Sequence, residues 1–543
     1  MRALVPWNRS SARISLALAT AGGVGPPSNT QSIRAAARLA IGRDHFATSA
    51  RNFCSRGLAA ALLFAAVAAP SFATPAAKAR TESWFEFFFH SKKVGFLYAL
   101  DEPTTVEGRA AVHSLRRSVL VVRRADQVIH MESETDAWSE LDGNPIRFKH
   151  VRTEGGARRT LEGTREGAVF AVRVDVGGTL TEKKHPLVKG TRYILSSAMD
   201  AFFKRDLAVG KKEVGQAILE EDGDVRPYTV EVKGKEGDLF IVQSEVAGIV
   251  SKELVTAAGL TTRTTVERLG AEFIGTTRDK ALAAVDPTDI FGAAHLRTGV
   301  RLPKTERIDA LTVRLRGKSG RPPKPITDAR HKVTDKAKDS VVLVVKAEEV
   351  PPKSPKLGVL PKDPEGVKFL VETPYEQIKD ERLQSAAKKA IGDATDTWTA
   401  AKRLNAFVHS NITKKSLAQA FSTAIEALEA KEGDCTEHAV LMSALAKTVG
   451  IPARLVTGLV YVGGEEGIFG YHEWVELRIG DRWVAMDPTF GQDLADVSHV
   501  KFSQGLSDAD GLREAGIAAA ELFGDLELTV LEYVEIGGKK TRP

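Results

Sequence analysis

The chain of 543 residues has very little cysteine and no long apolar run. Its two cysteines, Cys54 and Cys435, are too few for the disulfide framework of a small secreted domain. No histidine and cysteine pair has the spacing of a zinc site, so a metal centre is not expected. The longest apolar run, residues 58–69, is shorter than the roughly 20 residues that a membrane-spanning helix needs. These shortages exclude three classes of protein: disulfide-rich small domains, zinc-dependent enzymes and proteins that cross a membrane with a helix.

Residues 1–73 resemble an export signal with an unusual extension before it. Arg51 and Arg56 precede the apolar run LAAALLFAAVAA, and the small-residue ending PSFA closes at Ala73, as in a secretory signal peptide. Residues 1–50 are rich in arginine, serine and alanine. We interpret them as an over-long gene start, and a transit-peptide-like extension is the alternative. We therefore expect an exported protein, periplasmic or secreted, with no integral membrane segment after cleavage.

Cleavage after this segment would change both charge and cysteine content. The whole chain carries a formal charge of +6, and residues 1–73 contribute +7 from eight arginines and one aspartate, which leaves 6 − 7, or −1. A nucleic-acid partner therefore loses its electrostatic support. Cys435 becomes the only cysteine. A lone thiol outside the cytosol is either reactive or a buried small apolar side chain.

The rest of the sequence divides into three segments after the leader of residues 1–73. Short alternating runs broken by Gly and Asp predict a mostly antiparallel β domain over residues 82–300. Residues 301–370 are proline-rich and predict a small β module or a semi-rigid connector. Residues 371–543 begin with helical periodicity and continue with alternating strands. The predicted fold class is α+β, with the β domain first and the mixed domain last.

The β domain opens on the stretch WFEFFFHSKKVGFLYALDE. This stretch resembles the start of the large curved sheets in bacterial envelope proteins of the LolA-like or DUF3108-like kind. The resemblance implies a sheet and carries no chemistry with it.

Cys435 lies at the predicted start of a helix. Asp434 is a favoured N-cap residue, and Glu437 completes a capping box three positions later. A helix N-terminus favours the thiolate form of a cysteine. Its free N–H groups could also stabilise an oxyanion formed at an attacked carbonyl. His438, on the same helix, has less freedom to aim at the sulfur, and we assign it a structural role.

A predicted β-hairpin brings a histidine and an aspartate together. The segment HEWVELRIGDRWVAMDP has a two-residue Gly-Asp turn at positions 480–481, with Gly where a type II′ turn requires it. In the register set by that turn, Trp474 lies opposite Asp487. His472 shares a face with Trp474, so His472 and Asp487 become diagonal neighbours, about 7–8 Å apart at the backbone. A slip of one residue would place them on opposite faces.

The motifs GDCTEHA, YHEW and RWVAMDPTFGQ, in this order, resemble the Cys–His–Asp core of the transglutaminase-like superfamily, a bacterial branch of papain-like thiol enzymes. The resemblance covers about residues 375–500. It implies that Cys435 is the nucleophile, His472 the base and Asp487 the residue that orients the base. Asn411 as an oxyanion donor and Trp474 as a wall of the substrate cleft are tentative assignments.

This resemblance implies a thiol enzyme for acyl transfer that needs no cofactor, and the signal-peptide-like segment adds that it is exported. The expected substrate is a polypeptide or a peptide of the peptidoglycan type. Water as the acceptor would make a cysteine peptidase or amidase, which we favour, whereas an amine would make a cross-linking transglutaminase. The triad serves both reactions. A third hypothesis is an envelope binding module that retains the triad without using it.

Overall fold

The computed structural model describes residues 80–543 except 125–126, 155–156, 205, 286, 288–294, 352, 415–421, 509–510, 512–513, 517 and 520–524. The expected leader of residues 1–73, with Cys54, lies outside the described residues. Among the helices that are described, none combines the length and apolarity needed to cross a membrane.

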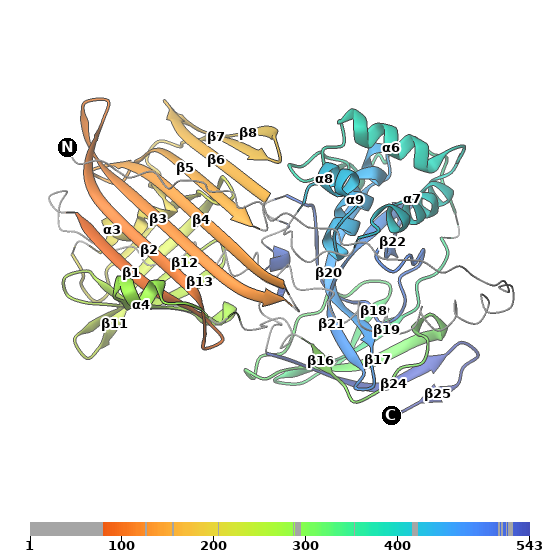
Figure 1. The fold of residues 1–543 in the computed structure, drawn as a ribbon. Helices are drawn as coiled ribbons and strands as arrows, with labels where there is room; N and C mark the ends of the chain where they lie inside the picture. Colours follow the sequence, from red (N-terminus) through yellow and green to blue (C-terminus); the bar gives the residue numbers. More distant parts are fainter. Residues whose placement is uncertain are drawn as a thin grey trace, which may run out of the picture. The chain divides into compact units, whose positions relative to one another are not determined.

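The first region is a 15-stranded sheet (Figure 1). Its strands are β1 (Thr81–Phe89), β2 (Lys92–Val106), β3 (Arg109–Arg124), β4 (Gln127–Glu140), β5 (Pro145–Glu154), β6 (Ala157–Glu166), β7 (Val169–Val176), β8 (Thr179–Pro186), β9 (Tyr193–Leu195), β10 (Lys212–Leu219), β11 (Asp224–Glu236), β12 (Leu239–Val246), β13 (Ile249–Val255), β14 (Thr261–Val266) and β15 (Ala271–Thr276). Strands β1 to β8 pair antiparallel with their sequence neighbours, and so do strands β10 to β15. Strand β9 pairs parallel with β10, and β1 pairs antiparallel with β15, so β8 and β9 lie at the two ends of the sheet. The predicted antiparallel β region is confirmed.

Alternation of side chains explains why these residues form strands. In β1, Phe85, Phe87 and Phe89 are buried, whereas the residues between them are partly exposed. This is the period of two that a half-buried strand requires. Phe87 stacks on Phe273 of the paired strand β15, with ring centroids 4.5 Å apart. Two short helices accompany the sheet, α3 (Met199–Phe203) and α4 (Arg278–Leu282).

A second sheet, which we call the β module, joins the proline-rich segment to the C-terminal end of the chain. Its order is β18-β19-β17-β24-β25, with β17 (Ile308–Gly317), β18 (His331–Lys336), β19 (Ser340–Lys346), β24 (Leu526–Glu535) and β25 (Lys540–Thr541). Three of these strands, β17, β18 and β19, come from residues 301–370. The pairing of β17 with β24 extends the β module beyond residue 370, to a partner more than 200 residues away in the sequence.

The third region is the mixed α+β part that the sequence predicts. After the short helix α5 (Pro364–Lys368) come α6 (Glu381–Ile391), α7 (Thr397–Asn411), α8 (Ala424–Ala430) and α9 (Cys435–Thr448). The sheet has the order β16-β21-β20-β23, with β22 paired to β21. Its strands are β16 (Leu296–Arg297), β20 (Ala453–Gly463), β21 (Ile468–Ile479), β22 (Arg482–Met486) and β23 (Val500–Gly505). Helices α6 to α9 gather beside β20–β22 in Figure 1.

Helix α9 is the centre of this region. It contacts α6, α7 and α8 as well as β20 and β21. Every residue from Cys435 to Lys447 is consequently buried, so the helix has more than the single apolar stripe seen in its sequence. Near its C-terminal end, the buried ammonium of Lys447 pairs with the carboxylate of Glu376. Helix α9 is therefore held from several sides.

Candidate active site

Cys435 is the first residue of α9, as predicted. The side chain of Asp434 accepts a hydrogen bond from the backbone N–H of Thr436 at 2.9 Å. The side chain of Glu437 accepts one in return from the N–H of Asp434, also at 2.9 Å. The predicted capping box is present. Cys435 itself is 2% exposed, so the thiol is held at a helix N-terminus in a nearly water-free position.

The predicted hairpin register is confirmed. Ile479 pairs with Arg482, and Val475 pairs with Met486. Gly480 has a φ of +67°, which the first position of a type II′ turn requires. This register brings the Nε2 atom of His472 to 2.6 Å from Oδ2 of Asp487, the residue that follows β22. The diagonal contact predicted from strand geometry is thus a direct hydrogen bond.

The buried carboxylate controls the protonation of the buried imidazole. Burial alone would lower the pKa of His472, but the charge and hydrogen bond of Asp487, with a further contribution from Cys435, raise that pKa to about 10. Burial likewise opposes ionisation of Asp487, and its two histidine partners outweigh it and hold the pKa well below its usual range. His472 hydrogen-bonds Cys435 as well. Because Asp487 occupies Nε2, the atom left for the thiol is Nδ1.

Further groups fix Asp487 and the ring of His472. The Oδ1 atom of Asp487 accepts from the backbone N–H groups of Thr489 at 2.8 Å and Phe490 at 3.2 Å. The Phe490 ring stacks on the His472 ring, with centroids 4.9 Å apart. The carboxylate is therefore anchored by its own following turn, and the imidazole is covered on one side by an aromatic ring.

His499, which was not predicted from the sequence, lies on the far side of Asp487. Its Nε2 atom is 3.0 Å from Oδ2 of Asp487, and the residue is wholly buried. His499 precedes β23 directly, in the stretch ADVSHV, where no periodicity or motif marks it. Only the folding of the loop after Asp487 reveals the contact.

The two residues tentatively assigned to the substrate cleft, Trp474 and Asn411, have other contacts in the structure. Trp474 is completely buried with Val456, Ala485 and Ala495, and its ring is 6.2 Å from that of His472. It packs behind the imidazole. Asn411 is the last residue of α7, and its Nδ2 atom donates to the carbonyl of Leu428 at 3.3 Å. That contact points its amide toward α8.

Two other titratable groups surround the start of α9. His438 is buried, and its Nδ1 atom hydrogen-bonds the carbonyl oxygen of Asp434, one turn earlier in the same helix. This agrees with a structural role. Burial, followed by the charges of Cys435, Asp434 and Glu437, raises the pKa of Glu473 well above its ordinary value. This buried carboxyl group was not foreseen from the sequence.

Within the described residues, His472, Asp487 and His499 also form a group whose donor atoms lie within 4.8 Å of one another. Their closest separations are 2.6 and 3.0 Å. Ligands of a tetrahedral zinc ion, each about 2.0–2.1 Å from the metal, are roughly 3.3 Å apart. The observed lengths are those of hydrogen bonds. We interpret the group as a hydrogen-bonded network.

Comparison with known proteins agrees with this geometry. Residues 384–488 match the Transglutaminase-like superfamily, a range that contains Cys435, His472 and Asp487, so the predicted resemblance is confirmed. No curated protein sequence matches the chain.

Three solved structures are similar over parts of the chain. A proposed cysteine protease from Cytophaga hutchinsonii is 16% identical, with 46% of this chain and 90% of that one covered and a TM-score of 0.30. A β-barrel-like DUF1849 protein from Brucella abortus is 12% identical, with 38% and 97% covered and a TM-score of 0.27. The periplasmic domain of TgpA from Pseudomonas aeruginosa, bound to ethylmercury, is 15% identical, with 37% and 94% covered and a TM-score of 0.25. At these scores the likenesses carry no argument about activity.

Proposed function

Since residues 384–488 form a transglutaminase-like domain, we propose that the protein is an exported thiol enzyme that hydrolyses peptide or amide bonds. The observation that carries the proposal is the buried hydrogen bond of 2.6 Å between His472 and Asp487, next to a thiol at a helix N-terminus. Nucleophile, base and orienting group are the parts that covalent catalysis by a cysteine needs.

The reaction begins with transfer of the Sγ proton of Cys435 to Nδ1 of His472. The thiolate then attacks the amide carbonyl, and the oxyanion develops beside the N-terminus of α9, where the helix dipole favours negative charge. Collapse of the tetrahedral intermediate breaks the C–N bond. The imidazolium of His472 gives its proton to the departing amine, and a thioester to Cys435 remains.

The thioester is resolved by a second acyl transfer. His472, neutral again, takes a proton from water, and the hydroxide attacks the thioester carbonyl. The C–S bond breaks, a carboxylic acid leaves, and the thiol is restored. An amine in place of water would give a new amide bond, which is the cross-linking reaction. Asp487 keeps the Nε2–H tautomer and the ring orientation through both halves.

The substrate class and location belong to the same proposal. A polypeptide or a peptide of the peptidoglycan type supplies the amide carbonyl that this site attacks. Export is supported by the basic flank, apolar run and small-residue ending before residue 74. The large antiparallel sheet has no assigned chemistry, and a binding role for it is compatible with an active thiol.

A peptide-library experiment tests the reaction. The mature chain is incubated with mixed peptides and a labelled primary amine, and products are read by mass spectrometry, with Cys435→Ser as the control. Cleavage that needs Cys435 and leaves free carboxylates supports hydrolysis. Faster incorporation of the amine than cleavage would move the assignment to cross-linking. Absence of both, with an unreactive thiol, would favour the binding-module hypothesis.

A further inference from the structure

The carboxylate of Asp487 is shared by two histidines. Its Oδ2 atom is 2.6 Å from Nε2 of His472 and 3.0 Å from Nε2 of His499. Both imidazoles and the carboxylate are wholly buried. A carboxylate oxygen with two nitrogen donors has less rotational freedom than one with a single donor. His499 therefore acts on the atom that orients the proposed base.

The second nitrogen of His499 also faces acceptors. Its Nδ1 atom is 3.2 Å from both the backbone oxygen and Oδ1 of Asp496. An acceptor lies at each ring nitrogen, an arrangement that favours the imidazolium form, in which both nitrogens donate. Burial opposes this charge, but hydrogen bonds to Asp487 and Asp496 prevail and raise the pKa of His499. The ring of His499 is thus held between two carboxylates.

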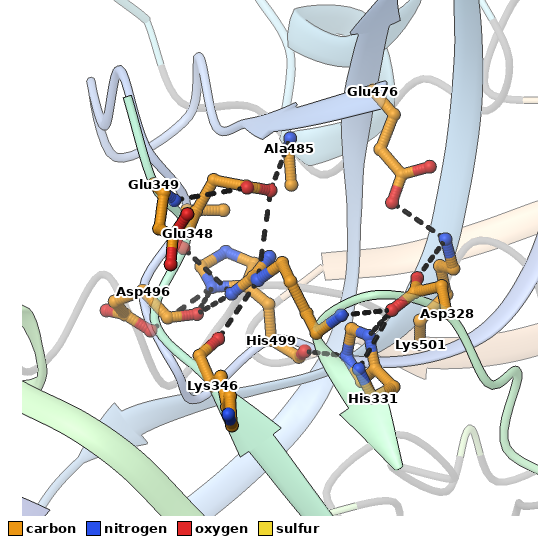
Figure 2. Close-up of polar contacts among 12 residues, drawn as sticks. Asp328, His331, Lys346, Glu348, Glu349, Glu476, Ala485, Asp496, His499 and Lys501 are labelled. Atoms are coloured by element: carbon orange, nitrogen blue, oxygen red, sulfur yellow. Dashed lines mark hydrogen bonds and ion pairs between the residues drawn. The ribbon is translucent and has the colours of Figure 1, made fainter. Parts of the chain in front are cut away.

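The β module holds the backbone of His499 in place. The Nε2 atom of His331, the first residue of β18, donates to the carbonyl of His499 at 2.8 Å, and Nδ1 of His331 contacts Asp328 at 2.9 Å. Lys501 joins Asp328 to Glu476 of β21, with both distances 2.7 Å. Figure 2 shows this chain of contacts running from Glu476 through Lys501, Asp328 and His331 to His499.

The preceding residues of the same loop are held by the same region of the chain. Nη2 of Arg330 donates to the backbone carbonyls of Ala495 at 2.9 Å and Asp496 at 2.8 Å. The hydroxyl of Thr305 donates to Oδ2 of Asp496 at 2.5 Å. The carboxylate of Glu348 accepts from the N–H of Ala485, in the strand that leads to Asp487. Residues on both sides of Asp487 are therefore fixed by side chains from the proline-rich segment.

We propose that His499 is a positioning residue of the thiol site, which holds Asp487 against His472, and that the β module fixes His499 through His331 and Arg330. The proposal rests on the proposed function for its catalytic meaning. It gives the segment of residues 301–370 a role that its sequence alone does not reveal. The charged groups that face His499 are Asp487, Asp496 and the imidazole of His472, whose ring centroid is 5.8 Å away, and His331 binds its backbone.

A pair of variants separates the two contacts of the His499 ring. In His499→Gln the amide nitrogen replaces Nε2 and still reaches Asp487. In His499→Asn the amide replaces Nδ1, so it keeps Asp496 and loses Asp487. His150→Phe is the matched control, because His150 is an equally buried histidine, in β5, bonded to Thr135. Circular dichroism and thermal unfolding establish that each variant is folded.

The main readout is the titration of the His472 imidazole, followed by NMR on the full mature chain labelled at histidine nitrogens. Both His499 variants remove any positive charge on this side chain, so the comparison between them isolates the contact with Asp487. We expect the pKa of His472 to be at least one unit lower in His499→Asn than in His499→Gln, and His150→Phe to leave it within half a unit of wild type. Equal His472 titration in the Asn and Gln variants would overturn the positioning role. His331→Phe keeps the His499 ring and is expected to lower the pKa of His472.

Alkylation of Cys435 by iodoacetamide at pH 6 is the second readout. We expect at least a tenfold slower rate in His499→Asn and at most a threefold change in His499→Gln. In an Asp487→Asn background, His499→Asn should have no further effect, because its action passes through Asp487. Additive losses would contradict the proposal. If the wild-type thiol is unreactive while the pKa of His472 still responds to His499→Asn as expected, the proposed function is wrong and the positioning role is supported.

Discussion

Lys447, in the last turn of α9, forms an ion pair with Glu376, and neither side chain is exposed to solvent. The pair ties the end of the helix that begins with Cys435 to a segment 71 residues earlier. Such a buried pair is a weak source of net stability, but breaking it leaves one charge without compensation.

Lys447→Met is therefore expected to destabilise the fold by about 3–5 kcal/mol, measured by chemical denaturation. Lys149→Met is the control, because Lys149 and Glu162 form an exposed pair, and such pairs contribute at most about 1 kcal/mol. The double variant Lys447→Met with Glu376→Leu should regain much of the loss. A loss below 1 kcal/mol in Lys447→Met would show that the pair is not buried as described.

The N-cap of α9 is expected to matter for both stability and thiol reactivity. Asp434→Ala removes the acceptor of the Thr436 N–H and should cost about 0.5–2 kcal/mol. It should also slow alkylation of Cys435, because the first turn loses its fixed geometry. Asp396→Ala removes the cap of α7 in the same way, so it should lower stability and leave the alkylation rate unchanged. Equal rates in both variants would contradict a link between this cap and the thiol.

Asn411 provides a test of the tentative oxyanion assignment. Because its amide donates to the carbonyl of Leu428, we expect Asn411→Ala to change the hydrolysis rate less than fivefold. Loss of a true oxyanion donor costs about 10²–10³ in kcat. A loss of that size in kcat for Asn411→Ala, with KM unchanged, would show that Asn411 is an oxyanion donor after all.

The His472–Asp487 contact should give stability a defined pH dependence. The pKa of His472 is raised from its ordinary 6.5 to about 10, so its contribution is fully present below about pH 6.5 and is lost as pH rises through 10. The lowered pKa of Asp487 acts in the opposite sense, with a contribution present above about pH 4 and lost in acid. The unfolding midpoints of wild type and Asp487→Asn should differ most at pH 4–6.5 and converge toward pH 10. A constant difference across this range would contradict the coupled pair.

How much of this site the sequence predicts depends on how local each contact is. The capping box at Asp434 and the hairpin register between Ile479 and Arg482 follow from neighbouring residues, and both are confirmed. The hairpin register alone predicts that His472 contacts Asp487. The antiparallel sheet is also predictable, because its strands pair mostly with their sequence neighbours.

Contacts between distant segments were not predictable. His499 meets Asp487 through an irregular loop, and His331 meets His499 from 168 residues away. The paired residues of β17 and β24 are also far apart in the sequence, by more than 200 residues. None of these contacts leaves a periodic pattern, because each depends on how separate elements pack. Asn411 is only a tentative oxyanion donor in the sequence, and its amide donates to the carbonyl of Leu428 in α8.

The proposed function requires Cys435 and His472 to act as a thiolate–imidazolium pair. The iodoacetamide alkylation rate of Cys435 from pH 4 to 9, in the mature wild-type chain and in His472→Ala, tests this pair most directly. We expect fast labelling well below pH 8 that collapses in His472→Ala. Slow labelling with the profile of an ordinary thiol in both proteins would contradict it.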